Sequence, residues 1–295
     1  YTEEEQNDLL NRGKVNVVIH VDRGFSRNLF AGNDANIQLA YDGSDSNTAM
    51  IVMGYANTIV QNYQYNLLRN EVDAKGWLST APSVDLRDRA WFNGNLISRN
   101  YYLPGVIATI VTMMSLLLTA MAIVKEKEIG TMEQLIVSPL RPIELILGKL
   151  LPFAIIALIQ ITLITVLGVL WFHVPLRGNL LLLLFSTCIY LFTTLGIGLF
   201  ISTVSATQQE AMMSVFLFYM PTVLLSGFAY PIANMPKVIQ WFTFFNSLRY
   251  FMVVIRSIFL KGVGLEVLWA QLVPLFIMGV IVIAFSALRF RKSLA

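Results

Sequence analysis

A charged segment of the chain, residues 125–149, lies between two long apolar runs and carries the side chains best suited to bind a partner. Within it, apolar residues recur at spacings of three and four, which gathers them on one face of a helix. The pattern ends at Pro139 and Pro142, because proline lacks the backbone N–H and disfavours helical geometry in the preceding residue. The sequence therefore predicts a surface helix at about residues 126–138, either a docking helix for a partner or a plain connection between spans. Its polar members are Glu126, Glu128, Glu133 and Gln134, and its apolar members are Ile129, Met132, Leu135 and Ile136.

No motif in the sequence indicates catalysis or nucleotide binding. A G-x-x-x-x-G-K-[ST] loop is absent, so any ATP must be bound by another chain. The one cysteine, Cys188, lies inside an apolar run, and His20 and His173 are far apart, so we expect neither a disulfide framework nor a metal site. We therefore expect a protein that is not an enzyme by itself and binds no cofactor directly.

Composition indicates an integral membrane protein surrounded by lipid. The chain is 56% hydrophobic and 13% charged, with a mean hydropathy of +0.64, whereas about a quarter of the residues in soluble domains are charged. The net charge of +3 is small and its positive residues lie mostly near the ends of apolar runs. Nucleic acid is therefore not an expected partner.

Five uncharged runs are long enough to cross a membrane, because about 20 helical residues at about 1.5 Å each span an apolar core of about 30 Å. They are residues 104–124, 150–172, 180–202, 211–228 and 267–288. Residues 231–262 are also apolar but include Arg249 and Arg256. Charges placed in this way favour a re-entrant outer hairpin, which begins at Pro231 and includes Pro236, over a sixth lipid-facing span.

Residues 1–100 have the pattern of a small α/β domain. β-branched or alternating stretches predict strands at residues 15–21, 35–42 and 84–93, with helices between them at about 23–32 and 46–69. The predicted fold is thus a polytopic α-helical membrane protein with domains at 1–100 and 101–295. Because no initiator methionine opens the chain, we expect one further span upstream of Tyr1.

Lysine and arginine near the span ends predict the orientation. Seven lie on the side of the 125–149 loop and the C-terminal tail, and five lie on the opposite side. The first side is therefore expected to be cytoplasmic, which places the N-terminal domain outside the cytoplasm. The seven are Lys125, Lys127, Arg141, Lys149, Arg289, Arg291 and Lys292, and the five are Arg177, Lys237, Arg249, Arg256 and Lys261.

The interiors of the five spans contain no charged residue, which disfavours proton-driven transport and leaves sodium coupling through hydroxyls and carbonyls open. Polar and aromatic residues in two spans are candidates for the wall of a pathway that accepts hydrophobic or amphipathic compounds. The alternative for each hydroxyl is a hydrogen bond between helices. The candidates are Thr112, Ser115, Thr119, Phe216, Tyr219, Thr222 and Phe228.

Five stretches of the sequence carry a family resemblance. The most specific is E-K-E-I-G-T-M-E-Q-L-I-V-S-P, residues 126–139. The others are W-F-N-G-N-L-I-S-R-N-Y-Y-L-P-G (91–105), I-S-T-V-S-A-T-Q-Q-E-A-M (201–212), S-G-F-A-Y-P-I-A-N-M-P (226–236) and S-L-R-Y-F-M-V-V-I-R-S-I-F-L-K-G (247–262). Together they resemble the permease subunits of type-2 ABC exporters of the bacterial multidrug-efflux kind. The chain departs from that pattern at Gly94, where relatives often carry proline.

The resemblance implies a role for the predicted surface helix. In this family the helix after the second span is a coupling helix, which inserts into a cytoplasmic ABC ATPase subunit that binds ATP and Mg²⁺. Two permease chains, identical or paralogous, work with two ATPase chains in the bacterial inner membrane; a periplasmic adaptor is left open. The outer hairpin closes the external end of the pathway. Besides the residues of the two helix faces, the coupling residues implied are Gly130, Thr131, Ser138 and Pro139.

Two other functions are also compatible with the sequence. A related permease would export a lipid-linked glycan or another surface polymer, although the sizeable outer domain speaks against it. Alternatively, the chain is a membrane receptor or assembly scaffold that uses its outer domain to bind a partner and transports nothing.

Overall fold

The computed structural model describes residues 3–12, 15, 17–31, 35–44, 46–75, 84–130 and 142–294. The chain folds into two compact units, Tyr1–Tyr101 and Tyr102–Ala295. The first unit combines helices with a small sheet. The second contains helices joined by loops, and no strand among its described residues.

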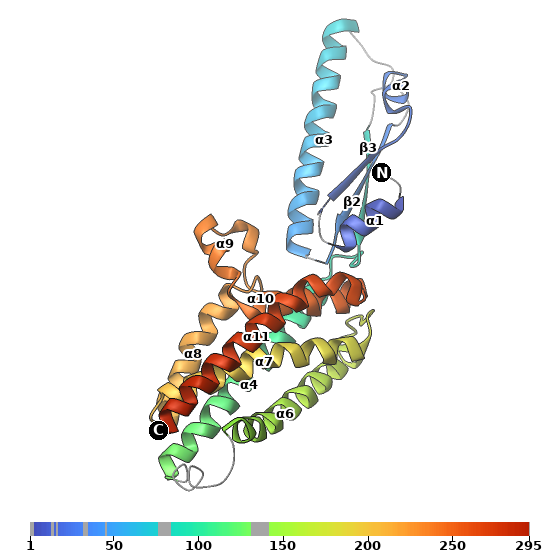
Figure 1. Cartoon of the computed structure of the whole chain (residues 1–295). Helices are drawn as coiled ribbons and strands as arrows, with labels where there is room; N and C mark the ends of the chain where they lie inside the picture. Colours follow the sequence, from blue (N-terminus) through green and yellow to red (C-terminus); the bar gives the residue numbers. More distant parts are fainter. Residues whose placement is uncertain are drawn as a thin grey trace. The chain divides into compact units, whose positions relative to one another are not determined.

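The first unit contains a three-stranded sheet with one long helix beside it (Figure 1). Strand β2 is central: it pairs antiparallel with β1 and parallel with β3, with Ile19 opposite Leu39 and Ile37 opposite Leu86. A parallel pair needs a crossover, and α3 supplies it between β2 and β3. The elements are α1 (Glu3–Asn11), β1 (Val17–Val21), α2 (Phe25–Phe30), β2 (Ala35–Asp42), α3 (Ser46–Lys75) and β3 (Val84–Trp91).

The core of the first unit lies between α3 and the sheet. Leu39 and Tyr41 of β2 are buried together with Ala49 of α3. A second group joins Leu29, Ala35 and Val84, with Val60 and Leu67 of α3 packed against it. These contacts follow from the alternation in β2, because every second side chain of a strand points to the same face.

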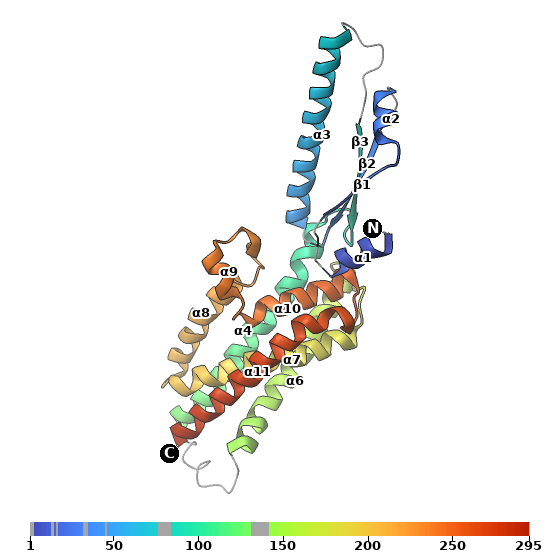
Figure 2. The same ribbon diagram turned by 45° about the horizontal axis from the view of Figure 1, so that its top comes forward.

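The second unit is a bundle, and within its described residues four helices are long and apolar enough to cross a membrane. These spans are α4 (Ser98–Ile129), residues 146–170 of α6 (Pro142–Leu170), α7 (Leu180–Val204) and residues 265–289 of α11 (Leu265–Leu294). Helices α7 and α11 lie side by side (Figure 2), and the hydroxyl of Ser286 donates to the carbonyl of Gly196 at 2.8 Å. The prediction of a polytopic helical membrane protein is therefore confirmed.

The span predicted at residues 211–228 is shorter than expected. It corresponds to α8 (Gln208–Leu224), which has 17 residues. The helix ends early because Gly227 has a φ of 80° and the Ser226 hydroxyl turns back to accept the N–H of Phe228 at 3.2 Å. Phe228 therefore lies in a turn after the helix and not within a span.

A bent hairpin follows α8. It comprises η1 (Ile232–Asn234), α9 (Lys237–Thr243), α10 (Ser247–Arg256) and η2 (Ser257–Lys261). Residues 237–243 and 247–261 together are apolar enough for a span but are bent by 81°, as in a broken span or a re-entrant loop. Pro231 and Pro236 are the residues before η1 and α9.

Polar side chains fix the bend of the hairpin. Asn246 caps α10 by accepting the N–H of Leu248 at 3.0 Å, and its amide donates to the carbonyl of Thr222 in α8 at 2.7 Å. The Arg249 guanidinium lies 4.1 Å from the centroid of the Phe244 ring and donates to the hydroxyl of Thr243. Arg256 donates to the carbonyl of Gly227 at 3.3 Å. Arg249 thus braces the bend of the hairpin, and Arg256 joins the hairpin to the turn after α8.

The loop between α6 and α7 is bonded to the end of the same hairpin. The backbone N–H groups of Arg177 and Gly178 donate to the carbonyls of Phe259 and Ile258 at 3.0 and 2.9 Å. A Cβ on Gly178 would lie 2.6 Å from the Ile258 carbonyl oxygen, closer than van der Waals contact allows. The close backbone approach therefore requires glycine at this position.

Candidate functional site

The charged end of α4 is the first candidate site, and the structure corrects the prediction made for it. Residues 126–129 do not begin a separate surface helix; they form the last turn of α4, which ends at Ile129. Gly130 follows with a φ of 80°, a backbone conformation that favours glycine. The helix continues past the apolar run because the polar side chains of its last turn bind neighbouring helices.

Lys127 binds the C-terminal end of α7. Its ammonium donates to the carbonyls of Ser202 and Thr203 at 2.8 and 3.2 Å. The last carbonyls of a helix lack backbone partners and lie at the negative end of the helix dipole. A lysine at this place therefore caps α7.

Glu128 binds the N-terminal end of α8. Its carboxylate accepts the backbone N–H of Gln208, the first residue of that helix, at 2.8 Å and also accepts from the Gln208 side-chain amide. The α8 terminus has its own cap in addition, because the Thr207 hydroxyl accepts the N–H of Glu210 at 3.2 Å. Glu128 thus places a negative charge at the positive end of the α8 dipole.

Glu126 forms an ion pair with Lys149 of α6. The Lys149 and Glu126 side chains are only 16% and 32% exposed, so water screens this pair less than it screens a fully exposed one. The pair connects the two helices that flank residues 131–141.

The remaining coupling residues lie outside the part of the chain that the structure describes, and their docking role stays a prediction. They are Thr131, Met132, Glu133, Gln134, Leu135, Ile136, Ser138 and Pro139. Ile129 itself is 63% exposed at the end of α4.

The hydroxyl residues predicted on α4 lie inside the bundle. Thr112, Ser115 and Thr119 are at most 2% exposed. Thr112 donates to the carbonyl of Ala108 at 2.6 Å, so its oxygen accepts the hydroxyl hydrogen of Tyr190 in α7, also at 2.6 Å. This is the helix-to-helix arrangement that the sequence left open as the alternative. A wall role for these residues stays a prediction.

The aromatic candidates of the predicted wall are more exposed than the hydroxyls. Phe216 is 40% exposed on α8, while Tyr219 is half-buried and directs its hydroxyl toward the carbonyl of Thr109 at 3.4 Å. Phe228 packs edge-on against Tyr102 at 6.3 Å between ring centroids. The structure therefore does not bring all seven wall candidates to one surface.

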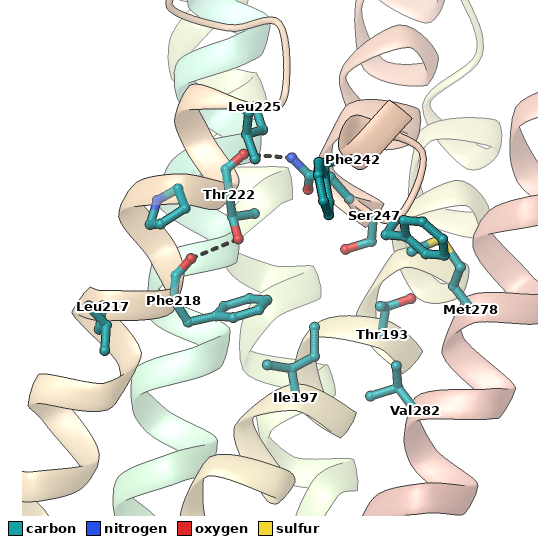
Figure 3. Close-up of a pocket in the computed structure, with 13 residues that line it drawn as sticks. Thr193, Ile197, Leu217, Phe218, Thr222, Leu225, Phe242, Ser247, Met278 and Val282 are labelled. Carbon is teal, nitrogen blue, oxygen red and sulfur yellow. Dashed lines mark hydrogen bonds between the residues drawn. The ribbon is translucent and has the colours of Figure 1, made fainter. Parts of the chain in front are cut away.

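A cavity of about 460 Å³ lies between α8, the hairpin, α7 and α11 (Figure 3). Thr222 is the one wall candidate that lines it. Apolar side chains dominate the rest of the lining, with polar groups from Thr193, Asn246 and Ser247. Such a mixture suits a ligand that is mainly apolar and carries a few polar groups. The apolar lining residues are Ile197, Leu217, Phe218, Pro221, Leu225, Phe242, Phe245, Met278 and Val282.

Sequence reasoning missed two features of these sites. The cavity draws on side chains spread from Thr193 to Val282, so no local pattern indicates it. The partners of Lys127 and Glu128 are 75 to 80 residues away, and three of their four bonds reach backbone groups, which carry no sequence signal. The alternating charges E-K-E at residues 126–128 were the feature of the sequence that could have indicated charged partners at this helix end.

The long apolar helices and the bent hairpin that follows α8 define a multi-pass membrane protein. The chain belongs to the ABC-2 family of transporter proteins, whose family model matches residues 1–288.

Three relatives from Escherichia coli K12 share this similarity over most of their length. The chain is 36% identical to the probable multidrug ABC transporter permease YbhR, over 90% of this chain and 70% of the relative. It is 33% identical to the probable multidrug ABC transporter permease YbhS, over 96% and 74%. It is 29% identical to the inner membrane transport permease YhhJ, over 99% and 77%.

Proposed function

We propose that the chain is the transmembrane permease subunit of an ATP-driven exporter that moves hydrophobic or amphipathic compounds out of the cytoplasm. The observation that carries this proposal is the family match over residues 1–288, together with relatives named as multidrug permeases. Those names favour drug-like compounds over a surface polymer and transport over a scaffold role.

The energy would come from a separate ATPase subunit that binds ATP and Mg²⁺. No phosphate-binding loop occurs in the sequence, and among the described residues no three acidic, histidine or cysteine side chains gather as a metal site. We propose that residues 131–139 dock in the ATPase and that a second permease chain, identical or paralogous, completes the exporter. Membrane lipids surround it, and an outer adaptor is a further candidate partner.

We also propose the orientation that the charges favour. Lys125, Lys127 and Lys149 gather where α4 ends and α6 begins, and the C-terminal end of α11, which carries Arg289, lies at the same end of the unit (Figures 1 and 2). This end would be cytoplasmic. Residues 1–100 and the bent hairpin would then face the outside of the inner membrane, with the hairpin closing the outer end of the pathway.

The substrate would pass along α8, beside the cavity. The lining of the cavity has no acidic or basic side chain. A charged compound would therefore find no partner there, whereas an apolar compound could be desolvated.

The test of the function is uptake into inverted membrane vesicles that hold the full permease and its partner ABC ATPase. We expect ATP-dependent accumulation of Nile red, a neutral lipophilic dye. Vesicles without the permease, or with an ATPase that cannot hydrolyse ATP, should not accumulate it. Equal dye levels in all three preparations would contradict the proposed function.

A bulky side chain in the cavity should impede transport without preventing assembly. Leu217 lines the cavity and is 78% exposed, so its replacement by tryptophan can reach into the cavity without disturbing buried packing. We expect the rate of dye uptake to fall about fivefold, as for a loss of about 1 kcal/mol of binding free energy. Leu224→Trp is the control, because Leu224 lies on the same helix, is 57% exposed and is not among the lining residues. Equal rates in the two variants would remove the cavity from the pathway.

A further inference from the structure

Three consecutive charged residues at the end of α4 bind three different helices. Glu126 pairs with α6, Lys127 with the end of α7 and Glu128 with the start of α8. Successive residues of an α-helix lie about 100° apart around its axis. Three consecutive side chains in one turn therefore point in three different directions. Together they can contact three helices, which a single side chain could not do.

The order of the charges matches the helix ends that they meet. Lys127 meets the negative end of the α7 dipole, and Glu128 meets the positive end of the α8 dipole. Exchanging the two charges would place each beside an end of its own sign. Both contacts also satisfy backbone groups that a helix end leaves without partners.

The three contacts lie at the base of the segment that we propose to dock in the ATPase. α4 ends at Ile129 and α6 begins at Pro142, and the pair between Glu126 and Lys149 joins the two helices near these ends. A displacement of residues 131–141 would therefore act on a helix end that is bonded to α6, α7 and α8. It would not move α4 alone.

We propose that Glu126, Lys127 and Glu128 form a clamp that positions α4, α6, α7 and α8 to move together when the ATPase moves the segment after α4. This inference rests on the proposed function and names the residues that transmit its energy. The clamp reaches the cavity directly, because α8 begins at the Glu128 contact and lines the cavity with Leu217 and Thr222.

The experiment measures the ratio of dye transported to ATP hydrolysed in the reconstituted complex of full permease and ATPase, with the neutral dye Nile red as the probe. Glu126→Lys and Lys149→Glu each place like charges together, and the double variant restores an ion pair. Lys127→Met removes the donor to α7, and Lys125→Met is its control, because Lys125 is an exposed residue two positions earlier on the same helix.

We expect each of E126K, K149E and K127M to lower the transport ratio about fivefold or more, the lower end of typical coupling energies between sites. The double variant E126K/K149E should recover most of the ratio, and K125M should keep it. A role in folding alone would reduce the amount of complex but leave the ratio unchanged. An unchanged ratio in E126K and K127M, measured on equal amounts of complex, would overturn the clamp.

Replacement variants and the wild-type complex keep the outcome decisive. If a charge reversal prevents assembly, the neutral variants E126Q and K127Q replace it, with the same expected fall in ratio and the same contrary result. If the wild-type complex shows no ATP-dependent uptake, the proposed function fails. The clamp fails separately, when the wild type transports and the variants transport with the same ratio.

Discussion

Replacing Gly178 with alanine will loosen the hairpin and abolish most transport. The new Cβ would lie 2.6 Å from the carbonyl oxygen of Ile258 and 3.2 Å from its Cα, and backbone atoms cannot rotate aside as a side chain can. The loop before α7 must move away and lose its two hydrogen bonds to η2. Overpacking costs about 1–3 kcal/mol and each of the two lost hydrogen bonds about 1 kcal/mol, so we expect the free energy of unfolding to fall by about 3–5 kcal/mol.

Thermal unfolding of the purified protein in detergent, together with dye uptake, checks this result. Gly264→Ala is the matched control, because Gly264 lies just beyond the hairpin and a Cβ there meets no atom within 4 Å. Equal stability of the two variants would mean that the loop is not held against the hairpin in the membrane.

Replacing Gly198 with alanine will push α4 and α7 apart. A Cβ on this residue would lie 2.8 Å from the Cβ of Thr119 and 3.2 Å from the backbone oxygen of Leu116. Both neighbours are fully buried in α4, so neither can turn outward. We expect a loss of about 1–3 kcal/mol in the free energy of unfolding. Transport should also fall, because α7 carries the carbonyls that Lys127 binds.

The same unfolding measurement with Gly148→Ala provides the comparison for Gly198→Ala. Gly148 lies in α6, where an added Cβ meets nothing within 4 Å, and alanine in a helix is favoured over glycine by about 0.5–1 kcal/mol. This control should be as stable as the wild type or more stable. A Gly198→Ala protein as stable as Gly148→Ala would contradict the close packing of α4 and α7.

Local pattern was enough to predict most elements. Strand β2 occupies residues 35–42, the range that its alternation indicates, and four of the five predicted spans recur as long apolar helices. These features depend only on composition and on the spacing of apolar residues, and both can be read from a single sequence. The long crossover helix α3 extends past its expected end to Lys75, and α1 was not anticipated.

Helix ends were predicted less well, because they depend on contacts made after folding. Hydropathy places the end of the first run at Val124, yet α4 continues through Ile129 because Glu126, Lys127 and Glu128 each find a partner on another helix. The reverse occurs in α8, where apolar residues continue but the turn at Gly227 ends the helix.

The candidate sites show the same limit. The sequence identified the charged segment and the polar residues of the spans. It did not show which of these polar residues bind other helices. Thr112 was a candidate for the wall, and its hydroxyl instead joins Tyr190, a residue 78 positions away. Tyr190 in turn stacks on Phe251 of the hairpin at 4.2 Å between ring centroids. Such pairings between distant helices are set by tertiary packing, for which the sequence offers no period.

We propose that residues 131–139 receive movement from a separate cytoplasmic ATPase. The most direct measurement places a single cysteine at Glu133 in a Cys188→Ser background and combines labelling by a membrane-impermeant reagent with cross-linking in the full complex. We predict labelling only from the cytoplasmic side, protection when the ATPase is bound, and a cross-link to the ATPase. Labelling from the outer side, or a cysteine that neither cross-links to the ATPase nor is protected by it, would show that this segment does not dock in the ATPase.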